Sequence, residues 1–256
     1  MRVVSLCPSN TEILWALGAA DVLVGLDRSS DFPESILGLP RVGPDIDVDV
    51  PTILALHPDL VLSSLSVPGM EKNVARLDAA GVPHIVIDAQ SLAGVFENIR
   101  VVGRLLGLGG RAAEVVAGMQ ARLDAVAGVA GSRQVRPKVC LEWWPKPVIV
   151  PGARCWTTEM IRIAGGESAF AHLDVRSTPI EDARVPEAAP DVILTSWCGV
   201  PHERQRPDKV YERAGWADVP AVRNRRVFAA EERYFGRPGP RLVEGVEWLA
   251  GVLASG

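Results

Sequence analysis

The segment HPDLVLSSLSVPGME at residues 57–71 returns 132 residues later as APDVILTSWCGVPHE at residues 189–203. Each copy places Pro-Asp before a short apolar run, a serine after that run and a glutamate at the end of the segment. A short apolar run with turn residues on both sides is typical of a strand buried in a parallel sheet. The repeat therefore indicates two related halves, each containing such a strand.

Short apolar runs alternate with helical patterns in both halves. Strands are expected at residues 2–6, 22–26, 59–64 and 84–88, and again at 138–143, 191–196 and 225–230. Helices are expected at residues 11–19, 70–81, 157–165, around 208–215 and at 240–254. Ser9 and Glu12 have the spacing of a capping box for the first helix. The alternation predicts parallel strands joined by crossover helices, so each half is expected to be an α/β layer structure.

A long helix is expected between the halves. Residues 91–106 and 111–129 have helical patterns and are separated by Gly107, Gly109 and Gly110. The second stretch is rich in good helix formers and would be roughly 28 Å long at 1.5 Å per residue. We therefore expect an N-terminal lobe at residues 1–107, a bridging helix at 108–131 and a C-terminal lobe at 132–256, with a cleft that closes little.

Composition and charge narrow the class of protein. The chain has 256 residues, of which 48% are hydrophobic, and a formal net charge of -4 without a basic run, which argues against nucleic acid as a partner. No apolar stretch approaches the ~18 residues that a transmembrane helix needs. Met1 leads directly into an apolar run without the features of a signal peptide, so the chain is expected either to be cytoplasmic or to have lost an export signal.

Several segments in a fixed order carry a resemblance to a known family. They are RVVSLCPSNTEILWALGA (2–19), VPTILALHPDLVLSS (50–64), CLEWW (140–144), TTEMIRIAGG (157–166) and VPAVRNRRVFAAEERYFGRPGPRLVEGVEWLA (219–250). Together they resemble the cobalamin and ferric-siderophore class of ABC-importer substrate-binding proteins, with the cobalamin-binding branch most similar. The resemblance implies a class III binding-protein fold, in which one long helix bridges two α/β lobes with mostly parallel sheets. It also implies a periplasmic or cell-surface setting, so the localisation stays open.

Candidate ligand-binding residues follow the expected strands, because ligands of α/β sheets gather beyond the carboxyl ends of the strands. The positions after the strands and at the start of the next helix are Pro8, Ser9, Pro68, Trp143, Trp144, Trp156 and Trp197. Tryptophan rings at a cleft suit a large, flat and partly apolar ligand. The resemblance adds Arg237, which matches a ligand-facing position of the cobalamin-binding proteins, with Tyr234 and Phe235 just before it.

Two glutamates are candidates for docking a partner. Glu71 and Glu203 end the two copies of the repeated segment and occupy matching positions in them. In the family that the chain resembles, one glutamate per lobe docks onto arginines of a two-fold symmetric importer permease. Glu212 competes with Glu203 for the role in the second lobe.

The expected ligand is a corrinoid, with a ferric siderophore or haem as the alternative and Tyr234 as the candidate axial ligand of haem. Zinc and manganese receptors need clustered histidines, whereas His57, His84, His172 and His202 are scattered. No G-x-G-x-x-G follows the first strand, and a tetrapyrrole metal chelatase would need a metal-handling histidine in its cleft. We therefore expect a monomeric, non-catalytic binding protein without a metal site or a prosthetic group.

Overall fold

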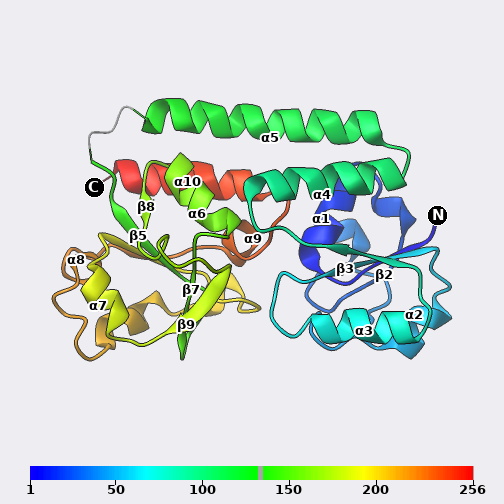
Figure 1. Cartoon of the computed structure of the whole chain (residues 1–256), viewed down its shortest axis with the longest axis horizontal. Helices are drawn as coiled ribbons and strands as arrows, with labels where there is room; N and C mark the ends of the chain where they lie inside the picture. Colours follow the sequence, from blue (N-terminus) through cyan, green and yellow to red (C-terminus); the bar gives the residue numbers. More distant parts are fainter. Residues whose placement is uncertain (132–134, 256) are drawn as a thin grey trace. The chain divides into compact units, whose positions relative to one another are not determined.

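The computed structural model describes residues 1–131 and 135–255, and the chain divides into two compact units (Figure 1). Unit 1 consists of Met1–Ala89, Ala93–Gly118 and Pro238–Pro240, and unit 2 consists of Gln90–Leu92, Met119–Arg237 and Arg241–Gly256. One boundary between the units falls within the helix α5 (Gly109–Ala130), and the others fall in the segments 89–93 and 237–241. The lobe boundaries expected from the sequence, after residues 107 and 131, stay a prediction.

Unit 1 contains a four-stranded parallel sheet. Its strands are β1 (Val3–Ser5), β2 (Leu23–Leu26), β3 (Leu60–Ser64) and β4 (His84–Ile87), in the order β2-β1-β3-β4. The central strands β1 and β3 are buried along their length apart from Leu60, as expected for hydrophobic runs covered on both faces. The order of strands reverses between β1 and β3, which makes this pair the topological switch point of the sheet.

Helices cover both faces of this sheet. They are α1 (Pro8–Ala16), α2 (Val50–Ala55), α3 (Glu71–Ala79) and α4 (Leu92–Leu105), with α2 and α3 on the face opposite α1 and α4 in Figure 1. The capping box expected at Ser9 and Glu12 is wrong. Cys7 is the N-cap without a side-chain hydrogen bond, and Ser9 already lies inside the first turn. Pro8 explains the early start, because its fixed φ suits the first helical position.

Unit 2 repeats this topology. Its parallel strands β5 (Lys138–Glu142), β8 (Glu167–Ser168), β10 (Val192–Thr195) and β11 (Val227–Ala229) pair in the order β11-β10-β5-β8. Here β5 corresponds to β1 and β10 to β3, so β5 and β10 form the switch point. The two copies of the repeated segment therefore supply the same strand of two equivalent sheets, and the expected α/β class is confirmed.

Unit 2 contains a second sheet that was not predicted from the sequence. Its antiparallel strands are β6 (Trp144–Pro145), β7 (Val148–Pro151) and β9 (Ser177–Ile180), with Val148 paired to Ile180. The strands are short and each contains a proline, which lacks the backbone N–H that a ladder uses. Such segments give little local strand signal, because their pairing is between residues far apart in the sequence.

The helices of unit 2 lie on both faces of its parallel sheet. They are α6 (Trp156–Ile163), α7 (Arg184–Ala188), α8 (Pro220–Arg223), α9 (Glu232–Phe235) and α10 (Leu242–Ala254). The helix expected around residues 208–215 is instead a 3-10 turn at Pro207–Glu212. Pro207 and Gly215 bound this segment and leave too few residues for a stable α-helix. None of the helices in the described part of the chain is long and apolar enough to span a membrane.

Candidate functional site

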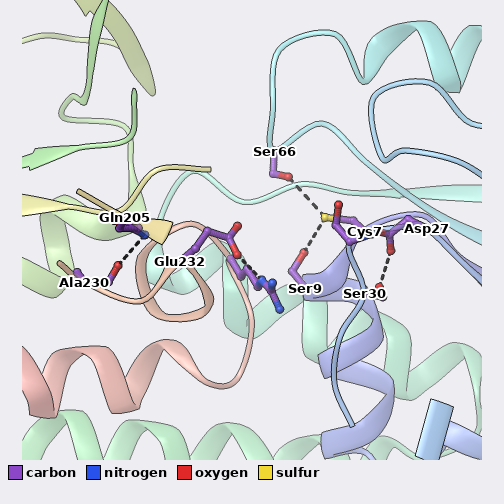
Figure 2. Close-up of polar contacts among 10 residues, drawn as sticks. Cys7, Ser9, Asp27, Ser30, Ser66, Gln205, Ala230 and Glu232 are labelled. Carbon is purple, nitrogen blue, oxygen red and sulfur yellow. Dashed lines mark hydrogen bonds and ion pairs between the residues drawn. The ribbon is translucent and has the colours of Figure 1, made fainter. Parts of the chain in front are cut away.

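The switch point of unit 1 carries a cluster of small polar side chains (Figure 2). Cys7, which follows β1, places its Sγ 3.3 Å from Ser9 Oγ and 3.8 Å from Ser66 Oγ, which follows β3. Ser66 in turn accepts a hydrogen bond from the hydroxyl of Ser64 at 3.0 Å. Burial raises the pKa of the Cys7 thiol to about 11, so Cys7 is a neutral thiol and a weak nucleophile at neutral pH.

A buried carboxyl group lies beside this cluster. Asp27 follows β2 and is fully buried, and its carboxylate accepts a hydrogen bond from the Ser30 hydroxyl (Figure 2). It also accepts one from the backbone N–H of Ser29. Ser30 Oγ is 2.9 Å from Thr11 Oγ1, which donates to Ser5 Oγ. Burial raises the pKa of Asp27 to about 6, and its hydrogen bonds offset part of that rise. The carboxyl edge of sheet β2-β1-β3-β4 is therefore polar, and the partly buried guanidinium of Arg41 donates to the backbone oxygens of Asp27 and Ser30 at 2.9 and 2.7 Å.

The candidate residues of unit 1 differ in accessibility. Pro8 and Ser9 are buried in the first turn of α1, whereas Pro68 is exposed in the turn before α3. Because Pro68 is exposed, it could contact a ligand without a rearrangement of the protein, unlike Pro8 and Ser9. Ser9 belongs to the polar cluster through its contact with the thiol of Cys7.

The switch point of unit 2 is built on a buried ion pair. Glu142, the last residue of β5, is fully buried and accepts two hydrogen bonds from Arg213, at 2.5 and 2.8 Å. The indole N–H of Trp197, which follows β10, donates to the same carboxylate at 2.9 Å. The guanidinium of Arg213 also stacks 4.5 Å from the centre of the Trp216 ring. One carboxylate thus fixes an arginine and a tryptophan at the carboxyl ends of adjacent strands.

Two further tryptophans meet next to this network. Trp143 follows β5 and Trp156 starts α6, as expected, and their ring centres lie 5.7 Å apart. Both rings are buried, and neither indole N–H has a hydrogen-bond partner within residues 1–131 and 135–255. Trp144 is different, because it lies on β6 with 40% of its surface exposed. Buried polar groups without partners are uncommon in proteins and mark places where a ligand or an ordered water completes the bonding.

The segment after β11 holds the remaining candidates. Tyr234 is partly exposed and its hydroxyl is 3.3 Å from a donor nitrogen of Arg233. Arg237 is mostly buried and donates to Glu232 at 2.7 Å. Phe235, by contrast, is fully buried and packs edge-on against Trp248 at 6.0 Å. The structure therefore brings Tyr234 and Arg237 to the carboxyl edge of unit 2 and turns Phe235 into its core.

The candidate docking glutamates are exposed. Glu71 begins α3 and accepts a hydrogen bond from the backbone N–H of Gly69 at 2.8 Å. The backbone N–H groups of Glu71 and Gly69 lower the pKa of this carboxyl below its usual value, so it stays ionised. Glu203 lies in a short 3-10 turn, and its competitor Glu212 already pairs with Lys209 at 2.7 Å. The ion pair with Lys209 makes Glu212 the weaker candidate for docking, and Glu203 stays the candidate of unit 2.

Three residues that organise these edges were not predicted from the sequence. Glu142 and Arg213 form the buried pair of unit 2, and Asp27 is the buried acid of unit 1. Two of them could have been identified from the sequence. Glu142 is a charged residue at the end of an apolar run, and Asp27 directly follows another apolar run. Arg213 lies 71 residues from Glu142, and nothing in its local sequence points to that partner.

Two surface hollows lie away from these edges. One of about 440 Å³ is lined by Val48, Asp49 and Arg76 with their neighbours, and one of about 420 Å³ by Lys138, Glu167 and His172 with theirs. The second lies at the starts of β5 and β8, which is the amino edge of that sheet. Among the described residues, no three His, Cys, Asp or Glu side chains gather in a way that could hold a metal ion.

Comparison with known proteins gives a consistent result over the whole chain. The sequence model of the periplasmic binding protein family matches residues 3–234. An uncharacterised ABC transporter substrate-binding lipoprotein of Bacillus subtilis is 31% identical over 97% of this chain and 78% of its own length.

Two solved structures are also similar. The apo form of the periplasmic haem-binding protein RhuT of Roseiflexus sp. RS-1 is 29% identical with a TM-score of 0.83, over 99% of this chain and 98% of that one. The periplasmic vitamin B12-binding protein BtuF of Vibrio cholerae is 26% identical with a TM-score of 0.79, over 99% and 96%. The non-catalytic class predicted from the sequence is thereby confirmed. The chain belongs to the periplasmic binding protein family, whose members are substrate-binding components of transport systems.

Proposed function

We propose that this substrate-binding protein binds one corrinoid, such as cobalamin or cobinamide, and delivers it unchanged to the permease of an ABC importer. The observation that carries the choice of ligand is the charge balance of the unit 2 edge. Arg213, Arg233 and Arg237 each contact a glutamate, at 2.5, 2.6 and 2.7 Å. An edge whose arginines are already neutralised favours a ligand with uncharged polar groups over an anion.

Corrinoids have the matching chemistry. Their ring is large and partly apolar, and its periphery is mostly neutral amide side chains. Indole rings suit such a ligand, because the ring face stacks and the N–H can donate to an amide oxygen. Trp143 and Trp156 supply two buried N–H groups that have no partner in the described part of the chain. The Vibrio cholerae relative, whose name states vitamin B12 binding, supports the same choice.

Haem is the second candidate, favoured by the likeness to the haem-binding protein of Roseiflexus. Tyr234 would be the axial ligand, and the nearby Arg233 would stabilise its phenolate. Haem carries propionates, however, and these would approach arginines that already face carboxylates. A ferric siderophore, which is usually anionic, meets the same obstacle.

The setting and the partner are part of the proposal. The two solved relatives are named periplasmic and the Bacillus relative is named a lipoprotein. These names support a location of this protein outside the cytoplasmic membrane. We infer that the protein acts as a monomer that meets the permease through Glu71 and Glu203.

Absorption spectroscopy separates the three ligand classes. The purified protein is mixed with cobinamide, haem and a ferric siderophore in turn, and each mixture is passed over a desalting column. We expect the corrinoid spectrum to stay with the protein and the other two to be lost. Retention of haem with a phenolate-type spectrum, and loss of cobinamide, would replace the corrinoid by haem.

A further inference from the structure

The partly buried pair of Glu232 and Arg237 lies in the segment that follows β11. Arg237 Nε donates to Glu232 Oε2 at 2.7 Å, and the two side chains are 9% and 20% exposed (Figure 2 shows Glu232). Gln205 Nε2 donates to the carbonyl oxygen of Ala230 at 3.3 Å, which ties the segment after β10 to the residue before this turn (Figure 2). The pair therefore belongs to the same edge of the sheet as Trp143 and Trp197.

Because Gly236 has no side chain, the side chain of Glu232 can occupy the space next to its Cα. A Cβ at this position would lie 2.8 Å from Glu232 Oε1 and 2.9 Å from its Cγ, which is closer than real Cβ atoms come. The backbone φ of Gly236 is -89°, a value that any residue adopts. Glycine is thus required here for space and not for conformation. An alanine would displace the flexible carboxylate of Glu232 from its seat beside Arg237.

The position of Glu232 determines the charge of this part of the edge. With the carboxylate beside the guanidinium, Glu232 and Arg237 form a pair that has no net charge. A carboxylate on a ligand would approach Glu232 as well as Arg237, and like charges brought together in a buried place are unfavourable. A neutral amide would not meet this repulsion.

We propose that Glu232 is a specificity-determining residue, which by neutralising Arg237 makes this edge select a macrocycle with amide side chains over the same macrocycle with carboxylate side chains. This inference rests on the proposed corrinoid function and deepens it. Glu232 needs no contact with the ligand for this role, because its effect is on the charge that the ligand meets.

Two probes with one corrin ring test the proposal. Cobinamide carries amide side chains, and cobyrinic acid carries carboxylates in their place. The dissociation constants of both are measured by absorption titration for the wild type, Glu232→Gln, Gly236→Ala and the double variant Glu232→Gln with Arg237→Gln. The readout is the ratio of the two constants, since a general loss of structure weakens both ligands alike. Gly251→Ala is the control for the glycine, because its added Cβ would meet no atom within 4 Å among the described residues.

We expect the preference for cobinamide to fall at least tenfold in Glu232→Gln and in Gly236→Ala. It should return to within about threefold of the wild type in the double variant, which removes both charges. An unchanged ratio in Glu232→Gln, or an equal loss for both probes, would overturn the proposal. If the wild type binds neither corrinoid, the proposed function fails. In that case the ratio of the dissociation constants of haem and its bis-amide derivative, compared between the wild type and Glu232→Gln, decides whether Glu232 sets the preference for amide over carboxylate side chains.

Discussion

The carboxylate of Glu142 accepts the indole N–H of Trp197 at 2.9 Å, at the carboxyl ends of the neighbouring strands β5 and β10. This bond uses the one hydrogen-bond donor of the Trp197 side chain, which is buried. Trp143 and Trp156 are the opposite case, since neither indole N–H has a partner in residues 1–131 and 135–255. Of the three tryptophans Trp143, Trp156 and Trp197, one therefore has its indole N–H bonded within the protein and two have theirs without a partner among the described residues.

The pair of Glu142 and Arg213 should couple strongly in stability. Glu142→Gln leaves the largely buried guanidinium of Arg213 without its counter-charge, and breaking a buried pair costs about 3–5 kcal/mol. We expect a loss of that order in the free energy of unfolding, measured by urea titration. Removing both charges, in Glu142→Gln with Arg213→Gln, should recover a large part of it. A double variant that loses the sum of the two single losses would show that the pair is not coupled.

Loss of the edge tryptophans should weaken corrinoid binding. Trp197→Ala and Trp143→Ala each remove an aromatic contact worth about 0.5–1.5 kcal/mol beyond its buried area, which corresponds to a several-fold rise in the dissociation constant. Trp15→Ala is the control for loss of a tryptophan outside unit 2, because Trp15 lies on α1 against Phe32 with 43% of its surface exposed. Affinity that survives removal of both Trp197 and Trp143 would mean that the ligand binds elsewhere.

Asp27 predicts a fall in stability between about pH 4 and pH 6. Its pKa is about 6 in the folded protein and 3.8 in the reference state, so the folded state binds more protons in that window. The free energy of unfolding therefore decreases as the pH rises through the window, by about 3 kcal/mol at one pKa unit per 1.36 kcal/mol.

The variant Asp27→Asn isolates this contribution. Urea unfolding at several values between pH 4 and pH 7 should show the variant gaining stability relative to the wild type as the pH rises. Taking the difference removes the titrations that both proteins share. A difference that is constant across the range would mean that Asp27 titrates normally.

The exposed glutamates should act on the partner and not on the fold. Glu71→Arg with Glu203→Arg should leave corrinoid affinity and the melting temperature nearly unchanged, because exposed charges contribute little to stability. Binding to the cognate permease should be lost, since like charges juxtaposed at an interface cost several kcal/mol. Pull-down of the permease measures this, with Glu114→Arg on α5 as the control for an exposed glutamate. Capture of the permease by the double variant at the wild-type level would refute the docking role.

Much of the fold was predictable from local patterns. The strands around the repeated segment and the helices around residues 92–130 lie where the apolar runs and helix formers place them. The sheet of β6, β7 and β9 was not, because its proline-containing strands are held by pairings such as Val148 with Ile180. The site shows the same limit. Trp143 and Trp197 were predicted because they follow the carboxyl ends of expected strands. The pairing of Glu142 with Arg213 could not be predicted in this way, because it depends on the tertiary fold.

Isothermal titration of the wild-type protein with cobinamide tests the central claim most directly. We predict a single site that saturates at one corrinoid per chain in the micromolar range or tighter. The Glu232→Gln variant should also bind cobinamide, but its preference for cobinamide over cobyrinic acid should be smaller than that of the wild type. No heat with cobinamide or cyanocobalamin at micromolar concentrations, together with saturable binding of haem or a ferric siderophore, would contradict the corrinoid assignment.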